Sequence, residues 1–419
     1  MKQARYWLGL MLLCGVVQAQ DAQVVVMTSY PQELINRYES AFEQAHPDVD
    51  LVLEWRRSDD ARLLLESGSN AVDVYWAPSL DTFVALADAG YFATLPLPFD
   101  GVPGRIGQLR VDDAASRFAA FEVAGFGVAY SLDWLAQAGL EPPRDWTSLH
   151  DPRYAEALLL PVPSRQGFSP MIYQSIVSGS GWEAGWALIT ELGAQGELMQ
   201  SGGGAFIDDL AGGRRGLALS IDFFAKSAQQ NGQNVGFRYA DTTLLSPAYV
   251  AQLAQAPHPD AARLFLDFVL SDAGQALLLA PDVARLPVRP TAYPADAEFD
   301  PFAANIAVPA FDFNQAGARL SVLTALFDVQ ITERHDQLSD LLSRIDSALA
   351  RADASTSTKL QQARQMLFAP ALDLASSEQL VARLQSGELN ADALPVEQWR
   401  HTLAHRQAEI ERLLAAAAP

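Results

Sequence analysis

The N-terminal part of the chain alternates between strand and helix patterns. A β-branched apolar run at 24–28 leads to Pro31, after which apolar residues recur at helical spacing as far as Pro47. Residues 49–55 alternate apolar and polar positions, which predicts a second strand. Shorter patterns of helix, strand and helix follow at 61–67, 72–76 and 80–89. This β-α-β-α-β-α order predicts a parallel sheet covered by helices.

A second unit of the same kind begins with a long strand-like run at 121–130. Strand patterns at 158–163 and 217–221 and helix patterns at 133–139, 171–177 and 182–192 follow it. Residues 258–280 then carry a strong helical pattern. The whole body is therefore predicted to be α/β, built from two alternating units.

From Ala318 onward the pattern becomes purely helical. Helices are predicted at 318–352, 359–367 and 396–418, with Ser355 to Thr358 as a linker or a helix cap. A proline-rich connector at 281–309 separates this tail from the α/β body.

Composition and charge narrow the range of functions. The chain has 419 residues, 49% of them hydrophobic, so a mostly disordered protein is excluded. Its formal net charge of −21 argues against a general nucleic-acid binder and against a protein that binds anionic membranes, because both need a basic surface. Cys14 is the single cysteine, so no intrachain disulfide can form.

The N-terminus resembles a secretory signal peptide. Lys2 and Arg5 precede an apolar run at 7–17, which is too short to span a membrane. Val17-Gln18-Ala19 is a small-x-small pattern, so we expect cleavage after Ala19. The mature chain would contain no thiol, which suits an oxidising compartment such as the periplasm.

Two segments resemble markers of the bacterial extracellular solute-binding proteins. The first is the helical segment 256–275, and the second is 145–154, with the pattern Trp-x-x-Leu-x-Asp-Pro-x-Tyr. The ferric, polyamine and phosphonate branches of this family share the pattern. The layout with its helical tail is similar to a phosphoglycerate-related, regulatory branch, in which the binding protein partners a membrane sensor.

This resemblance implies the type II periplasmic-binding fold, in which two α/β lobes are joined by crossing strands. The crossings would lie near 122–130 and 244–250. The signal peptide would occupy 1–19, lobe one 20–121 and 246–317, lobe two 122–245, and the helical extension 318–419. A ligand would lie between the lobes.

Candidate ligand-binding residues follow strands and precede helices. Helix N-termini leave backbone N–H groups unpaired and carry partial positive charge, which favours anions. Arg165 adds a guanidinium that can bind a carboxylate or phosphate, although a surface ion pair explains it equally well. The serines would otherwise be helix caps, Asp222 the cap of the helix that follows it, and Tyr30 a core residue. The predicted set is Ser29, Tyr30, Ser58, Ser79, Ser164, Arg165, Gln166, Gly167 and Asp222.

The residue patterns argue against a resident metal and against catalysis. Ferric-binding relatives use adjacent tyrosines, whereas Tyr239 and Tyr249 stand apart here. His401 and His405 are spaced i,i+4 and could bind Zn²⁺, but without a third ligand a solvated helix face is favoured. Gly202 to Gly204 lacks the lysine of a phosphate-binding loop, and no Gly-x-Ser-x-Gly motif occurs. We therefore predict no catalytic residue, no cofactor and no metal.

The predicted function is a periplasmic solute-binding protein. It would capture a small, phosphorylated or carboxylated solute between two lobes and present it to an ABC importer. The alternative is a sensory protein that signals to a membrane sensor kinase without transport. In either case we expect a monomer with no nucleic-acid partner and no enzymatic activity.

Overall fold

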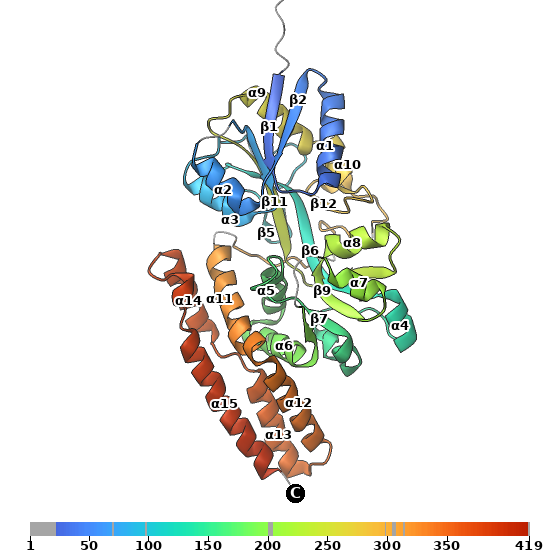
Figure 1. Ribbon diagram of the computed structural model, residues 1–419, viewed down its shortest axis with the longest axis vertical. Coiled ribbons are helices and arrows are strands. Elements are labelled where there is room, and N and C mark those ends of the chain that lie inside the picture. The colour runs from blue at the N-terminus through green and yellow to red at the C-terminus, as the bar shows by residue number, and fades with distance from the viewer. Residues whose placement is uncertain are drawn as a thin grey trace, which may run out of the picture.

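The computed structural model describes residues 22–68, 71–96, 99–199, 204–297, 299–303, 307–312 and 315–417. The predicted signal peptide and two of the glycines at 202–204 lie outside these ranges. The described residues form one large mixed sheet, with helices on its faces and a helical tail beyond it (Figure 1). The strands of the main path are ordered β2-β1-β3-β11-β6-β9-β7-β8.

The first three strands form the predicted parallel unit. Strand β1 (Ala22–Thr28) pairs in parallel with β2 (Val49–Trp55) on one side and with β3 (Val74–Ala77) on the other. The three helices of this unit are α1 (Gln32–Ala45), α2 (Ser58–Glu66) and α3 (Leu80–Asp88). The alternating order predicted from the sequence is confirmed.

Two long antiparallel strands connect the halves of the sheet. Strand β6 (Ala119–Ser131) pairs with β11 (Leu245–Gln252) through residues 119–125 and with β9 (Leu217–Ile221) through 126–130. The shorter strands of the sheet are β7 (Leu158–Leu160), β8 (Glu197–Leu198), β10 (Val235–Tyr239) and β12 (Leu286–Pro287). Strand β6 thus belongs to both halves, because each half pairs with a different part of it.

The remaining helices of the body cover the faces of the sheet. They are α4 (Leu132–Ala138), α5 (Ser169–Ser180), α6 (Trp182–Gln195), α7 (Phe206–Ala211), α8 (Asp222–Gln230), α9 (Pro259–Val269) and α10 (Asp272–Leu278). Strands β4 (Arg105–Ile106) and β5 (Leu109–Arg110) form a separate hairpin. The prediction of a single helix over 258–280 is wrong, because two helices, α9 and α10, occupy this segment. Ser271 caps a new helix there by accepting a hydrogen bond from the Gly274 backbone N–H.

The buried residues gather into two large hydrophobic cores. We call lobe one the part whose core is drawn from 24–123 and 245–308, and lobe two the part whose core is drawn from 126–244. The lobe-two core continues without a break into the tail, through buried residues between Val322 and Leu414. A smaller cluster lies around α7, α8 and β10.

The described part of the tail, residues 315–417, contains five α-helices. They are α11 (Ala316–Gln330), α12 (His335–Leu349), α13 (Ala354–Phe368), α14 (Leu374–Gln385) and α15 (Val396–Ala416). The predicted helix at 318–352 is interrupted between α11 and α12. Ser355 to Thr358, expected as a linker or a helix cap, lie inside α13, which Asp353 caps by accepting from the Thr356 N–H at 2.8 Å. Helix α14 was not predicted.

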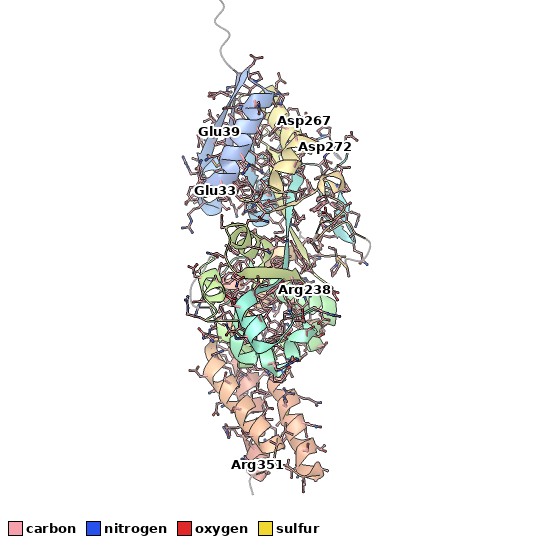
Figure 2. The ribbon with its side chains drawn as sticks, turned by 90° about the vertical axis from the view of Figure 1, so that its right-hand side faces the viewer. Glu33, Glu39, Arg238, Asp267, Asp272 and Arg351 are labelled. Atoms are coloured by element: carbon pink, nitrogen blue, oxygen red, sulfur yellow. The ribbon has the colours of Figure 1, made fainter. Side chains whose placement is uncertain are left out.

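The tail lies along lobe two, with α11 and α14 at the level of α5, and its helices α12, α13 and the end of α15 extend beyond lobe two, away from lobe one (Figure 1). A view turned by 90° keeps the same order, from Asp267 in lobe one through Arg238 in lobe two to Arg351 in the tail (Figure 2). Among the described residues, no helix has both the length and the apolar character that a membrane crossing requires.

Candidate functional site

The parallel strands of both lobes direct their carboxyl ends at one segment of β6. In lobe one, Ala77 at the end of β3 pairs with Tyr249 of β11, which pairs with Ala120 of β6. In lobe two, Ile221 at the end of β9 pairs with Phe126. The two sets of strand ends therefore meet over residues 121–125. Ligands of open α/β sheets bind at the carboxyl ends of strands, which makes this segment the candidate site.

Three of the predicted serines lie at the lobe-one edge of this segment. Ser29 follows β1, Ser58 opens α2 and Ser79 directly precedes α3, and all three are half-buried. The expected capping role does not apply to Ser79, because its hydroxyl donates to Thr82 Oγ1 at 2.9 Å and accepts no backbone N–H. Helices α2 and α3 therefore begin at this edge with their first N–H groups uncapped by these side chains.

Tyr30 lies beneath the same edge as a core residue. Its side chain is fully buried, with its ring 4.9 Å from that of Trp76 and 5.6 Å from that of Phe121, measured between centroids. Its hydroxyl donates a hydrogen bond to Glu122 Oε1 at 2.8 Å. In this structure Tyr30 therefore supports a carboxylate of the crossing strand.

A buried ion pair forms the centre of the site. Arg285 Nη1 donates to Glu122 Oε1 at 2.6 Å, and the side chains are 11% and 2% exposed. The guanidinium also lies over the rings of Tyr30 and Phe223, at 5.1 and 4.7 Å from their centroids. Burial raises the pKa of Glu122, and the positive charge of Arg285 opposes this effect. We call Tyr30, Glu122, Asp222 and Arg285 the crossing site.

Asp222 joins this cluster from lobe two. Its carboxylate is buried, and Oδ2 accepts from the Gly125 N–H and from the Tyr239 hydroxyl, both at 2.9 Å. Oδ1 accepts from the Phe223 N–H at 2.7 Å. Asp222 is the first residue of α8, and its side chain ties that helix to the crossing strand. Burial raises its pKa to about 6, and the hydrogen bonds from Gly125 and Tyr239 oppose the rise.

A cavity of about 330 Å³ lies where the lobes meet beside this cluster. Arg285 lines it from lobe one and Lys226, on α8, from lobe two. Tyr293 and Phe299 add aromatic surface to the wall. The lobe contact thus presents two cationic groups next to two buried carboxylates.

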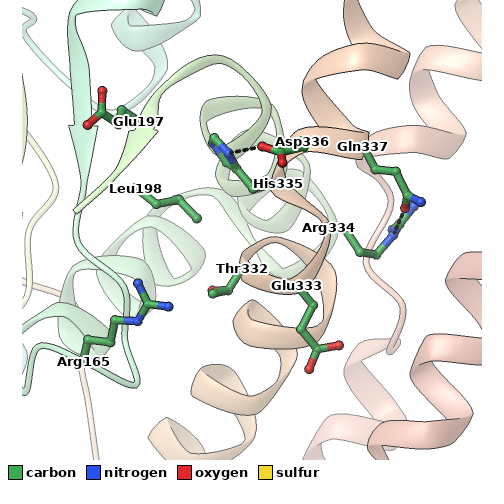
Figure 3. Close-up of a pocket in the computed structure, with 9 residues that line it drawn as sticks. All are labelled: Arg165, Glu197, Leu198, Thr332, Glu333, Arg334, His335, Asp336 and Gln337. Atoms are coloured by element: carbon green, nitrogen blue, oxygen red, sulfur yellow. Dashed lines mark hydrogen bonds and ion pairs between the residues drawn. The ribbon is translucent and has the colours of Figure 1, made fainter. Parts of the chain in front are cut away.

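The loop from Ser164 to Gly167 is arranged differently from the expectation. The Ser164 hydroxyl donates to Asp328 Oδ1 of α11 at 3.0 Å, and Arg165 lines a cavity of about 650 Å³ between lobe two and the tail. Figure 3 shows Arg165 and Leu198 facing Thr332 and His335 across this cavity. Gln166 is buried, with Nε2 3.4 Å from Met199 Sδ, and Gly167 is exposed. Ser164 and Arg165 are thus placed against the tail.

Sequence reasoning missed Glu122 and Arg285. One signal existed for the first: Glu122 is the one charged residue in the strand 119–131, and a lone carboxylate in an apolar strand needs a partner when it is buried. The partner lies far along the chain and has no local signature. Across the described residues, no group of three His, Cys, Asp or Glu side chains is placed to hold a metal ion.

The raised pKa of Asp222 predicts a pH dependence of stability. A carboxyl whose folded pKa exceeds its unfolded value stabilises the fold fully below the unfolded value, near 4, and this stabilisation is lost as the pH rises through about 6. Between pH 7 and pH 5 the ligand-free wild type should gain about 1 kcal/mol of unfolding free energy relative to Asp222→Asn. Urea titrations at both pH values measure this difference. Parallel pH profiles of the two proteins would contradict it.

Comparisons with known proteins agree on a family and a fold. The family model for "Bacterial extracellular solute-binding protein" matches residues 83–315. Phosphoglycerate transport regulatory protein PgtC of Salmonella typhimurium is 30% identical over 374 residues, which cover 87% of this chain and 89% of PgtC. Periplasmic binding protein AfuA of Actinobacillus pleuropneumoniae, solved with exogenous fructose-6-phosphate bound, superposes with a TM-score of 0.58 at 18% identity, covering 74% of this chain and 99% of AfuA.

Iron-bound HitA of Pseudomonas aeruginosa has the same fold, with a TM-score of 0.55 at 18% identity, covering 68% of this chain and 92% of HitA. At these identities the two structures establish the fold alone. The predicted type II periplasmic-binding fold with a helical extension is confirmed.

Proposed function

The chain belongs to the bacterial extracellular solute-binding protein family, and from this premise we propose that it is a periplasmic protein that captures a small anionic solute between its lobes and presents it to an ABC importer. The signal-peptide pattern at the N-terminus supports the periplasmic location. The proposed lobes are those predicted from the sequence, hinged at β6 and β11.

The proposal that the solute is an anion rests on the environment of Arg285. Within the described residues, Glu122 is the one hydrogen-bond partner of its guanidinium, and it engages a single nitrogen. Nε and Nη2 therefore retain N–H groups for a ligand, beside Lys226 and a cavity at the lobe contact. The uncapped starts of α2 and α3 supply further donors from lobe one. The overall negative charge acts against an anion only weakly at this range, because salt screens charges beyond about 8–10 Å.

Binding would be coupled to closure of the lobes. A solute that contacts Arg285 in lobe one and the start of α8 in lobe two gains its full set of contacts only when the lobes are closed. Shifting an open-to-closed ratio from 1:99 to 99:1 requires about 5.5 kcal/mol of differential binding. Two or three charge-assisted hydrogen bonds, at about 1.5–3 kcal/mol each, supply that amount. Strands β6 and β11 would absorb the bend as hinges.

A panel of solutes tests this proposal. Because PgtC is named for phosphoglycerate transport and AfuA was solved with a sugar phosphate, the panel begins with 2- and 3-phosphoglycerate and fructose-6-phosphate. Glycerate and fructose serve as matched controls without the phosphate, and succinate and citrate represent carboxylates. One anionic solute should raise the unfolding free energy by about 2.7 kcal/mol at a concentration 100 times its Kd. The uncharged control should have no effect.

Binding and lobe closure are measured separately for each solute of the panel. Thermal shift and calorimetry report binding, and small-angle scattering reports the compaction expected on closure. If no anionic solute stabilises the protein in either binding assay, an anionic ligand is excluded. Binding without any change in the scattering profile would exclude the coupling to lobe closure.

The tail favours a second candidate function, in which the protein signals occupancy to a membrane sensor. PgtC, a relative that matches 87% of this chain, carries a regulatory name. The loop that contains Ser164 is hydrogen-bonded to α11, so the tail is attached directly to a strand end of lobe two. Deleting the gene separates the two functions. Solute uptake is lost if the protein serves an importer, whereas induction by the solute is lost if it serves a sensor.

A further inference from the structure

Two histidines converge on the outer face of α15. Trp399 and Leu403 on this helix are buried against the other tail helices. His401 and His405 each follow a buried residue by two positions, about 200° around the helix, and both are exposed. Figure 1 shows α15 along the outer edge of the tail. Neither histidine is part of the crossing site or of the lobe-two core.

The geometry of this pair suits a shared metal ion. The two Nε2 atoms lie 3.2 Å apart, although the rings belong to successive turns of the helix. If both nitrogens bind the same Zn²⁺ at about 2.0–2.1 Å, their separation of 3.2 Å gives an N–Zn–N angle of about 100°. This angle is close to the tetrahedral value that zinc prefers. From the sequence spacing we considered a zinc site and favoured a solvated helix face, whereas the structure brings both nitrogens within chelating distance.

We propose that His401 and His405 form a two-nitrogen binding site for a divalent transition-metal ion on the surface of the tail. Imidazole is a preferred ligand of Zn²⁺, Cu²⁺ and Ni²⁺, whereas Mg²⁺ and Ca²⁺ prefer oxygen ligands. The protein supplies two ligands, and the exposure of both rings leaves the remaining positions open to water. The site is independent of solute binding at the crossing site.

Two carboxylates lie near the pair on the same helix. Glu397 and Glu409 lie one turn before His401 and one turn after His405, on the same face of α15. Each is now paired with a neighbouring arginine, Glu397 with Arg400 and Glu409 with Arg412. Their carboxylates flank the two imidazoles, but the paired arginines offset their charge, so the imidazole nitrogens carry the proposed site.

Calorimetry with ZnCl₂ on the tag-free chain tests the site. One Zn²⁺ per chain should bind saturably, and MgCl₂ at the same concentration should give no signal. His401→Gln and His405→Gln should each lose this binding, because one imidazole no longer forms a chelate. His46→Gln removes the histidine that directly follows α1 in lobe one and should bind Zn²⁺ like the wild type. Because both residues of the pair are exposed, the urea midpoints of the two α15 variants should match the wild type.

A spectroscopic measurement separates the pair from scattered weak sites. With one equivalent of Cu²⁺, the electron paramagnetic resonance spectrum should show coupling to two nitrogens in the wild type and in His46→Gln. Coupling to one nitrogen or none is expected in the two α15 variants. The proposal is overturned if the wild type binds no Zn²⁺ saturably, or if either α15 variant binds it as tightly as the wild type.

Discussion

Replacing Arg285 with methionine should weaken binding of the anionic solute by about thirtyfold to several-thousandfold, the range expected when one partner of a buried charge contact is removed. Methionine keeps a long unbranched side chain, so contact with the rings of Tyr30 and Phe223 is largely retained. The expected loss of affinity therefore measures the contribution of the guanidinium and not that of side-chain packing. Calorimetry with the tightest solute of the panel measures it.

The same variant should lose stability for a second reason, which needs its own control. Without Arg285, the Glu122 carboxylate is left buried and unpaired, and breaking such a pair costs about 3–5 kcal/mol. The double variant Glu122→Gln/Arg285→Met removes both charges and should recover most of that stability but none of the affinity. Stability and binding are thereby separated.

A matched arginine outside the site completes this design. Arg289 follows Arg285 by four residues and bonds to backbone oxygens of Asp100 and Leu270 within lobe one. Arg289→Met should lower stability and leave the solute affinity unchanged. The assignment of Arg285 to the site would be abandoned if the double variant bound the solute as tightly as the wild type.

The local pattern predicted the elements of the body well because those elements form from local spacing. Strand 49–55 and strand 217–221 match the structure residue for residue, and the crossing strand predicted at 121–130 is β6 at 119–131. Apolar alternation and turn residues determine such segments without reference to distant parts of the chain. The strand order and the convergence of strand ends then follow from the fold that the resemblance implied.

The polar partners could not be predicted in the same way. Glu122 and Arg285 are 163 residues apart in sequence, and the segment that carries Arg285 looks like an ordinary connector. Arg165 illustrates the opposite case, because its loop has every local mark of an anion site, yet the cavity that it lines lies against the tail. The tail packs on one face of lobe two through side-chain contacts among α6, α11 and α13. Because these helices are far apart in the sequence, the pattern of any one segment does not predict that face.

Deleting residues 318–419 should leave a chain that does not fold to a stable monomer. Helix α5 is buried at every position from Ser169 to Val177, and α6 is buried on nearly all sides from Leu188 to Ala194. A helix that is buried all round must have partners on all faces. The tail supplies some of those partners: the Phe327 ring lies 4.6 Å from that of Tyr173, measured between centroids.

Hydrogen bonds across the same boundary would be lost with the tail. Gln330 Nε2 donates to Thr190 Oγ1 at 2.6 Å, and Trp182 Nε1 donates to the Leu372 oxygen at 2.7 Å. The deletion leaves these buried partners and a large apolar surface facing water. The combined loss exceeds the roughly 5–15 kcal/mol by which a typical domain is stable. The tail would then be part of the fold of lobe two, whatever partner its outer surface contacts.

A point variant measures this coupling in a chain that still folds. Phe327→Ala should lower the unfolding free energy by about 3–5 kcal/mol, as expected for truncating a fully buried aromatic residue. Leu374→Ala, at an exposed tail position, should change it by less than about 0.5 kcal/mol. Urea unfolding followed by tryptophan fluorescence measures both variants, since Trp182 and Trp186 lie in this core and contribute to the signal. A truncated chain that unfolds cooperatively, with the solute affinity of the full-length protein, would show instead that lobe two is complete without the tail.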